Sequence, residues 1–239
     1  MKRLLIFPVV AMALLSSCSY QMNTLRSSNT QLDDKTGAFQ LENDSVKILY
    51  SFAGHNAPIH IDIYNKLNEP MYVDWERSAY IIDEKSSSYA DETVELNGVV
   101  SGTTIGRGIR YSDASVSAQI TLPKNVAFIP PHTQISKIES KISGQQLHNI
   151  SDELFTKTKL PTSYGQGSLN VRMANFDQEH SPFLFKSYLT LYTLNNNIPK
   201  FFIYQNDFYL SQAIRSGASP ESFGIESSRG DYFESSASN

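Results

Sequence analysis

Apolar side chains occupy every second position in two short segments, residues 46–52 and 59–63, with mainly polar residues between them. These apolar residues are Val46, Ile48, Tyr50, Phe52, Ile59, Ile61 and Ile63. Successive side chains of a β-strand point to opposite faces, whereas a helix repeats every 3.6 residues. The alternation therefore predicts two strands that each place one face against a hydrophobic core.

Further strand patterns follow at short intervals along the chain. Turn residues at 65–70 separate the second strand from 71–75 and 79–82, and the alternation returns in 116–122, 126–129, 183–192 and 200–210. The 13 Tyr and 13 Phe residues also favour strands. We predict an all-β, antiparallel, immunoglobulin-like β-sandwich that spans residues 37–213.

The segments without this alternation predict the rest of the organisation. Residues 18–36 are polar and predict a flexible tether, and the Gly/Ser-rich segment 83–113 predicts a mobile insertion with one hairpin near 94–100. The Ser/Gly/Glu-rich residues 214–239 predict a disordered tail. Two other segments are open. Residues 133–142 fit either an edge strand or a helical face, and Ser151 is placed to cap a short helix through Lys157.

The N-terminal segment has the layout of a secretory signal. Two basic residues, Lys2 and Arg3, precede an apolar run from Leu4 to Leu15, which is shorter than the roughly 20 residues that cross a bilayer. Small residues and Cys18, the single cysteine of the chain, come next. We expect residues 1–17 to be removed as a signal peptide.

The order Leu15-Ser16-Ser17-Cys18 resembles the lipobox of bacterial lipoproteins. The resemblance implies that Cys18 becomes the mature N-terminus, with a diacylglyceryl thioether and a palmitate-type acyl chain on its amine. One fatty chain binds membranes marginally, and three chains anchor a protein firmly. The Ser that follows Cys18 resembles outer-membrane sorting, and the absence of acidic residues from 19–30 favours the periplasmic leaflet over the cell surface.

A second resemblance concerns the domain. The segments Asn65-Lys66-Leu67, Tyr72-Val73-Asp74-Trp75 and Ile129-Pro130-Pro131, with the aromatic hairpin near the end, are similar to envelope lipoproteins of the Bacteroidetes that have no assigned activity. This resemblance implies no catalytic residues.

Charge and composition exclude several classes of function. Without residues 1–17 the chain keeps 18 basic and 24 acidic side chains, a net charge of −6, and so lacks the basic footprint of a nucleic-acid binder. With Cys18 lipidated, the mature chain has no disulfide, no thiol nucleophile and no cysteine-based metal site. We find no Gly-x-Ser-x-Gly motif, and the spacing of Gly102, Gly106 and Gly108 fits no nucleotide loop. We predict no catalytic residue, metal or cofactor.

Several exposed polar patterns are candidate sites. His60 and Asp62 share one strand face, but two ligands are too few for a catalytic zinc site, so a solvated face is expected. Arg229-Gly230-Asp231 resembles an integrin-recognition tripeptide, which we expect to arise by chance. Asp44-Ser45-Val46 resembles the O-glycosylation sequon of the Bacteroidetes.

The predicted ligand contacts are Tyr72 and Asp74 on one strand, and Tyr188 and Tyr192 on another. The sequence therefore predicts a lipid-anchored envelope protein that is a structural or interaction module, with its partner in the envelope. The alternative is a surface adhesin or glycan binder that uses these tyrosines with the 83–113 segment, and an enzyme ranks third.

Overall fold

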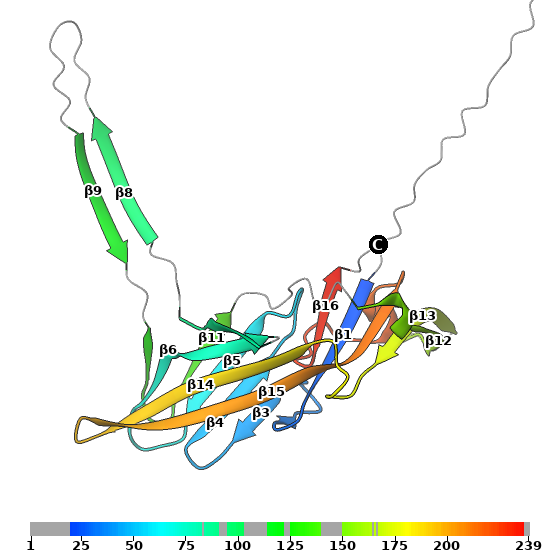
Figure 1. Ribbon diagram of the computed structural model, residues 1–239, viewed down its shortest axis with the longest axis horizontal. Helices are drawn as coiled ribbons and strands as arrows, with labels where there is room; N and C mark the ends of the chain where they lie inside the picture. Colours follow the sequence, from blue (N-terminus) through cyan, green and yellow to red (C-terminus); the bar gives the residue numbers. More distant parts are fainter. Residues whose placement is uncertain are drawn as a thin grey trace, which may run out of the picture.

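Strands make up most of the part of the chain that the computed structural model describes, which is residues 20–82, 84–90, 95–102, 114–121, 125–139, 150–163, 165 and 167–236. Two 3₁₀ turns, η1 (Asp152–Leu154) and η2 (Pro220–Phe223), are the helical elements within these ranges. The sheets are antiparallel, open and packed face to face, so the predicted all-β sandwich is confirmed (Figure 1).

The larger sheet has nine strands. Its central path runs in the order β10 (Val126–Ile129), β6 (Met71–Ile82), β14 (Leu184–Asn195), β15 (Ile198–Ser216), β1 (Tyr20–Ser27) and β16 (Tyr232–Ser236). Three strands join it from the side: β7 (Lys85–Ser88) pairs with β6, β13 (Ser168–Asn175) pairs with β15, and β12 (Thr156–Pro161) pairs with β13. The long hairpin of β14 and β15 lies at the centre of this sheet, as Figure 1 shows.

The smaller sheet has five strands in the order β11 (Gln134–Glu139), β5 (Ile59–Asn65), β4 (Val46–Ser51), β3 (Phe39–Glu42) and β2 (Gln31–Leu32). Strands β8 (Glu95–Gly102) and β9 (Ala114–Thr121) pair with each other and extend away from the two sheets (Figure 1). Burial alternates along β4 and β5, as the sequence predicts.

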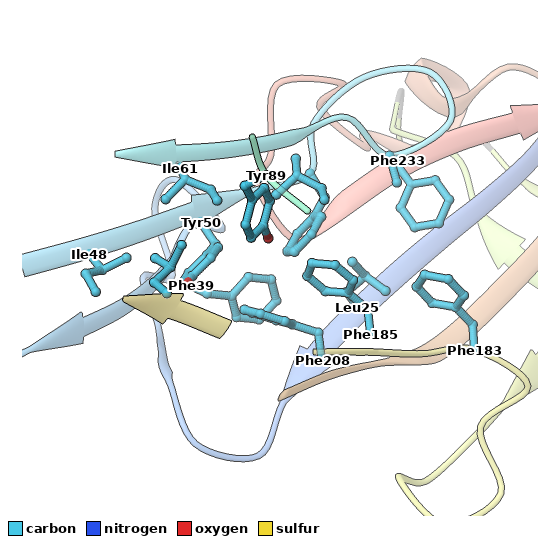
Figure 2. Packing of buried hydrophobic residues seen from close by; sticks show 14 of the residues in the cluster. Leu25, Phe39, Ile48, Tyr50, Ile61, Tyr89, Phe183, Phe185, Phe208 and Phe233 are labelled. Atoms are coloured by element: carbon cyan, nitrogen blue, oxygen red, sulfur yellow. The ribbon is translucent and has the colours of Figure 1, made fainter. Parts of the chain in front are cut away.

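The core lies between the two sheets and is rich in aromatic rings (Figure 2). Phe208 of β15 has edge-to-face contacts with Phe39, Tyr50 and Phe52, each with ring centroids 5.1 Å apart. Phe185 of β14 lies 5.5 Å from the same ring. Edge-to-face pairs add to the free energy of burial because the positive edge of one ring meets the negative face of another.

A small polar network lies inside this core. Ser187 Oγ accepts hydrogen bonds from the hydroxyls of Tyr50 at 3.1 Å and Tyr89 at 3.0 Å, and the Tyr50 hydroxyl also lies 3.2 Å from Asn206 Oδ1. All four residues are fully buried. The network joins β4 of the smaller sheet to β14 and β15 of the larger sheet and to the residue that follows β7, and the packing that keeps these buried hydroxyls hydrogen-bonded is favoured.

The predictions of a tether at 18–36 and a disordered tail at 214–239 are wrong for the described residues. Strand β1 begins at Tyr20 and lies between β15 and β16, and Phe233 of β16 is fully buried. Their polar side chains find partners across the sheet: Asn23 Nδ2 donates to Ser235 Oγ at 3.0 Å, and Arg215 Nε donates to Gln21 Oε1 at 2.9 Å. Paired in this way, polar residues are buried without the usual desolvation cost.

The segment 83–113 also differs from a purely mobile insertion. Residues 85–88 form β7, and Tyr89 is fully buried in the core. The predicted hairpin near 94–100 is wrong, because β8 pairs instead with 114–121. Residues 83, 91–94 and 103–113 lie outside the described ranges. The edge-strand interpretation of 133–138 is confirmed by β11, whereas the helix predicted through Lys157 is a single 3₁₀ turn that ends before β12 begins.

Candidate functional site: an aromatic row on the outer sheet face

Four aromatic side chains stand side by side on the solvent face of the larger sheet. The strand register places Phe128 of β10 opposite Tyr72 of β6, Tyr72 opposite Tyr192 of β14, and Tyr192 opposite Phe201 of β15. We call Phe128, Tyr72, Tyr192 and Phe201 the aromatic row. Side chains opposite each other on one face of antiparallel strands lie within contact distance, so the row is a direct product of the register.

The ring geometry makes the row continuous. Tyr72 and Tyr192 stack with centroids 4.9 Å apart and planes 10° apart. Phe128 lies 5.4 Å from Tyr72, and Phe201 lies 5.6 Å from Tyr192, both tilted by nearly 60°. Each tyrosine thus covers much of one face of the other, and the two outer rings close the ends.

The row is exposed and has apolar neighbours. Phe128 is 53% exposed and Phe201 is 43% exposed. The next cross-strand row carries Val126 and Ile203, and Leu194 lies on the same face two residues after Tyr192; all three are exposed. A single exposed apolar residue needs no explanation, but a contiguous patch of them marks an interaction site.

The charged pair Asp74–Arg77 borders the row. Arg77 donates its backbone N–H to Asp74 Oδ1 at 3.1 Å, and its Nε lies 3.7 Å from Asp74 Oδ2. The Arg77 guanidinium carbon also lies 5.4 Å from the Phe201 ring centre, a cation–π contact. The carboxylate braces the bulge in β6 and holds Arg77 over the ring. Partial burial, and then the negative charge of Asp74, raise the pKa of the Tyr192 hydroxyl.

The structure therefore brings three of the four predicted contact residues together. Tyr72 and Tyr192 are in direct ring contact, and Asp74 is in the adjacent cross-strand row. Tyr188 lies four residues from Tyr192 along β14, opposite Gln205 and Ala79. Its distance along the strand is about 13 Å, so it stands outside the row.

Sequence reasoning missed Phe128, Phe201 and Arg77. The strands 126–129 and 200–210 were predicted, so the outward direction of both phenylalanines follows from alternation. Their meeting depends on register among four strands, which no single segment encodes. Arg77 reaches Phe201 because β6 is irregular where its pairing with β14 shifts between Tyr188 and Thr190.

The other candidate motifs lie in places where their side chains are paired within the fold, exposed in a turn, or outside the described residues. Asp62 on the outer face of the smaller sheet accepts a hydrogen bond from Ser136, and in the described ranges no group of three or more His, Cys, Asp or Glu side chains is placed to hold a metal ion. Asp231 is buried and forms two hydrogen bonds with Arg229, at 3.0 Å each, so the Arg-Gly-Asp tripeptide braces the sheet edge. Asp44 is exposed in the turn between β3 and β4. Cys18 lies outside the described residues.

Two hollows lie elsewhere on the surface. One, of about 290 Å³, is on the outer face of the smaller sheet between Lys47, Asp62 and Tyr64. The other, of about 380 Å³, lies between the 178–179 loop and the β14–β15 hairpin. Neither includes a member of the aromatic row.

The chain matches no known protein family, and no curated protein matches it. Within the described ranges, no helix is long and apolar enough to cross a membrane. Among the described residues, the aromatic row is the surface at which aromatic rings, exposed apolar side chains and the Asp74–Arg77 pair meet.

Proposed function

We propose that the protein is a lipid-anchored cell-envelope module that acts without catalysis, by binding an envelope partner through the aromatic row. The observation that carries this proposal is the run of four touching rings across four strands, with both end rings about half exposed. Tyr, Phe and Arg are the residue types enriched in protein–protein interfaces. Rings held rigidly by a sheet lose little conformational entropy when a partner binds.

The position of the row along the molecule supports an outward-facing role. Strand β1 begins at Tyr20, two residues after Cys18, and Tyr20 pairs with Ser216 at the end of β15. Phe201 lies 15 residues earlier on β15, which corresponds to about 50 Å of strand. A lipid on Cys18 would hold the Tyr20 end of the sandwich close to the membrane and would present the row at the far end (Figure 1).

The anchor is tested by Cys18→Ala in the full-length chain. The expected result is loss of the protein from the membrane fraction, because the thioether cannot form. Ser19→Ala is the matched control, since it keeps the Leu-Ser-Ser-Cys order and should stay membrane-bound. Membrane association of Cys18→Ala equal to that of the unsubstituted protein would contradict the lipid anchor.

The binding role is tested by affinity capture of the native lipoprotein from crosslinked envelopes. We expect Phe201→Lys to lose a partner that the unsubstituted protein captures, because it puts a charge into the aromatic row. Tyr188→Lys is the matched control: it changes an aromatic residue on the same sheet face outside the row and should keep the partner. Identical captured proteins from both variants would contradict the assignment of the row.

A glycan-binding adhesin is the second candidate, and one observation favours it. The Phe128 ring is tilted by 58° relative to that of Tyr72 and is 53% exposed, so that ring is available to the apolar face of a sugar. The faces of Tyr72 and Tyr192 are largely covered by each other, and Arg77 lies over Phe201, which leaves little flat area for a chain of sugars. Digestion of intact cells with a protease separates the two, since an adhesin must be accessible from outside.

A further inference from the structure

We propose that strand β10 is a docking edge for a second copy of this chain, and that two copies pair antiparallel along β10. The inference rests on the interaction role of the aromatic row and names its partner. Phe128, the last ring of the row, lies on β10, so a strand added there extends the row across the contact.

The backbone of β10 has hydrogen-bonding groups that point away from the sheet. Trp75 donates its N–H to Asn125 C=O at 2.8 Å, which makes 75 and 125 a hydrogen-bonded pair. In an antiparallel ladder such pairs alternate, so Ala127 and Ile129 bond to β6. The N–H and C=O groups of Val126 and Phe128 therefore face the free side, where no described strand pairs with β10.

The other terminal strands of the nine-stranded and five-stranded sheets have features that discourage pairing. Strand β2 has two residues, β7 carries Lys85 and three serines, and β12 carries two lysines and Pro161. On β11, Lys137 lies 5.2 Å from the Trp75 ring, and β16 is bonded to the loop at residues 54–56. Natural edges are protected by short length, lysines, proline or coverage. Strand β10, Val-Ala-Phe-Ile, has no charge and no proline, and among the residues that the structure describes its protection is limited to its length of four residues.

The sequence of β10 is complementary to itself about a two-fold axis. With Ala127 opposite its symmetry mate, Val126 of each chain lies opposite Phe128 of the other, and about four backbone hydrogen bonds form. Both side chains are exposed and apolar, so each phenylalanine gains a contact with a valine. No charged side chain of β10 meets its own copy at the axis. Pro130, which has no N–H, ends the pairing.

So short a contact is weak, and disulfide trapping detects it. The register places the two Ala127 Cα atoms about 4.5 Å apart, in a non-hydrogen-bonded pair, which falls within the span a disulfide can bridge. The two Val126 Cα atoms are roughly 8 Å apart, beyond that span. The experiment compares A127C and V126C in the native, detergent-extracted lipoprotein under mild oxidation, with the unsubstituted protein as the measure of any reaction at Cys18.

We expect A127C to give at least about 10-fold more disulfide dimer on a non-reducing gel than V126C, and the added substitution Phe128→Lys to abolish it. An A127C protein that stays monomeric, or that crosslinks no better than V126C, overturns the proposal. Near-ultraviolet circular dichroism of each variant shows whether the fold is kept. If the A127C variant has lost the fold, sedimentation of the A127S variant shows whether two copies associate without a crosslink. The Phe128→Lys variant is the monomeric reference, and an equal mass for A127S and Phe128→Lys also overturns the proposal. Loss of crosslinking with continued capture of another envelope protein through Phe201 would remove this inference and leave the proposed function standing.

Discussion

The rings of Tyr72 and Tyr192 are stacked, with centroids 4.9 Å apart and planes 10° apart, because the two residues lie opposite each other on β6 and β14. They form the centre of the aromatic row, and each limits the rotamers of the other. The stacked pair should therefore contribute to the free energy of unfolding as well as to the exposed surface.

The stack predicts a measurable coupling between the two tyrosines. In a double-mutant cycle of Tyr72→Ala and Tyr192→Ala, we expect a coupling free energy of about 0.5–1.5 kcal/mol, the usual worth of an aromatic pair. Urea unfolding of the two single variants and the double variant gives this value. The pair Tyr72→Ala and Tyr188→Ala is the control and should be additive. Additivity in both cycles would argue against a stable stack in solution.

The strands that the sequence predicted well are those with one apolar face. In β4 and β5, Val46, Ile48, Ile59 and Ile61 are buried, as their alternation indicates. The Asn195–Asn197 turn forms the expected hairpin, with positive φ at Asn196 and Asn197, which suits a two-residue turn between twisted strands.

The strands that the sequence missed carry buried polar side chains. Gln21, Asn23 and Ser235 are almost completely buried, yet they look like residues of a tether or a tail. Their burial depends on hydrogen bonds between segments about 200 residues apart, such as that from Asn23 to Ser235. A local pattern cannot reveal a partner so distant. The aromatic row is hidden from local patterns for the same reason, because its four rings meet only through the pairing of four separate strands.

Phe208 is expected to be the most sensitive aromatic residue of the core. Its ring contacts those of Phe39, Tyr50, Phe52 and Phe185. Phe208→Ala should therefore lower the free energy of unfolding by about 3–5 kcal/mol, through lost burial and the cavity left behind. Phe201→Ala removes the same ring from an exposed position on the same strand and should cost less than about 1 kcal/mol. Equal losses in urea unfolding would contradict the placement of Phe208 in the core.

The polar network around Ser187 gives a second prediction for stability. Ser187→Ala removes the partner of two buried hydroxyls, those of Tyr50 and Tyr89, and should lower the free energy of unfolding by about 1–3 kcal/mol. Ser86→Ala, on the exposed strand β7, is the matched control and should change it by less than about 0.5 kcal/mol. A neutral Ser187→Ala would mean that the hydroxyls find other partners.

Two buried tyrosines predict a loss of stability at alkaline pH. Burial raises the pKa of the Tyr50 hydroxyl, and burial together with Glu234 raises the pKa of Tyr232. The folded protein therefore keeps protons that the unfolded chain releases near pH 10. Stability from these groups is complete below about pH 10 and is lost as the pH rises further. Denaturant midpoints should fall in that range, and less steeply in Tyr50→Phe. An unchanged slope in this variant would show that Tyr50 is already accessible in the fold.

The C-terminal strand β16 belongs to the core of the sheet, although its sequence predicts a disordered tail. Phe233 is fully buried, and β16 pairs along β1 from Tyr20 to Thr24. Phe233→Ala should lower the free energy of unfolding by about 3–5 kcal/mol. Glu234→Ala changes the next residue, whose side chain lies on the other face, and should cost less than about 1 kcal/mol. Because β1 carries the chain from Cys18 into the sheet, loosening β16 also loosens the end that a lipid anchor would hold. Protease digestion should then cut Phe233→Ala near residue 20 faster than the unsubstituted protein, and equal rates for both would mean that β16 adds nothing to that end.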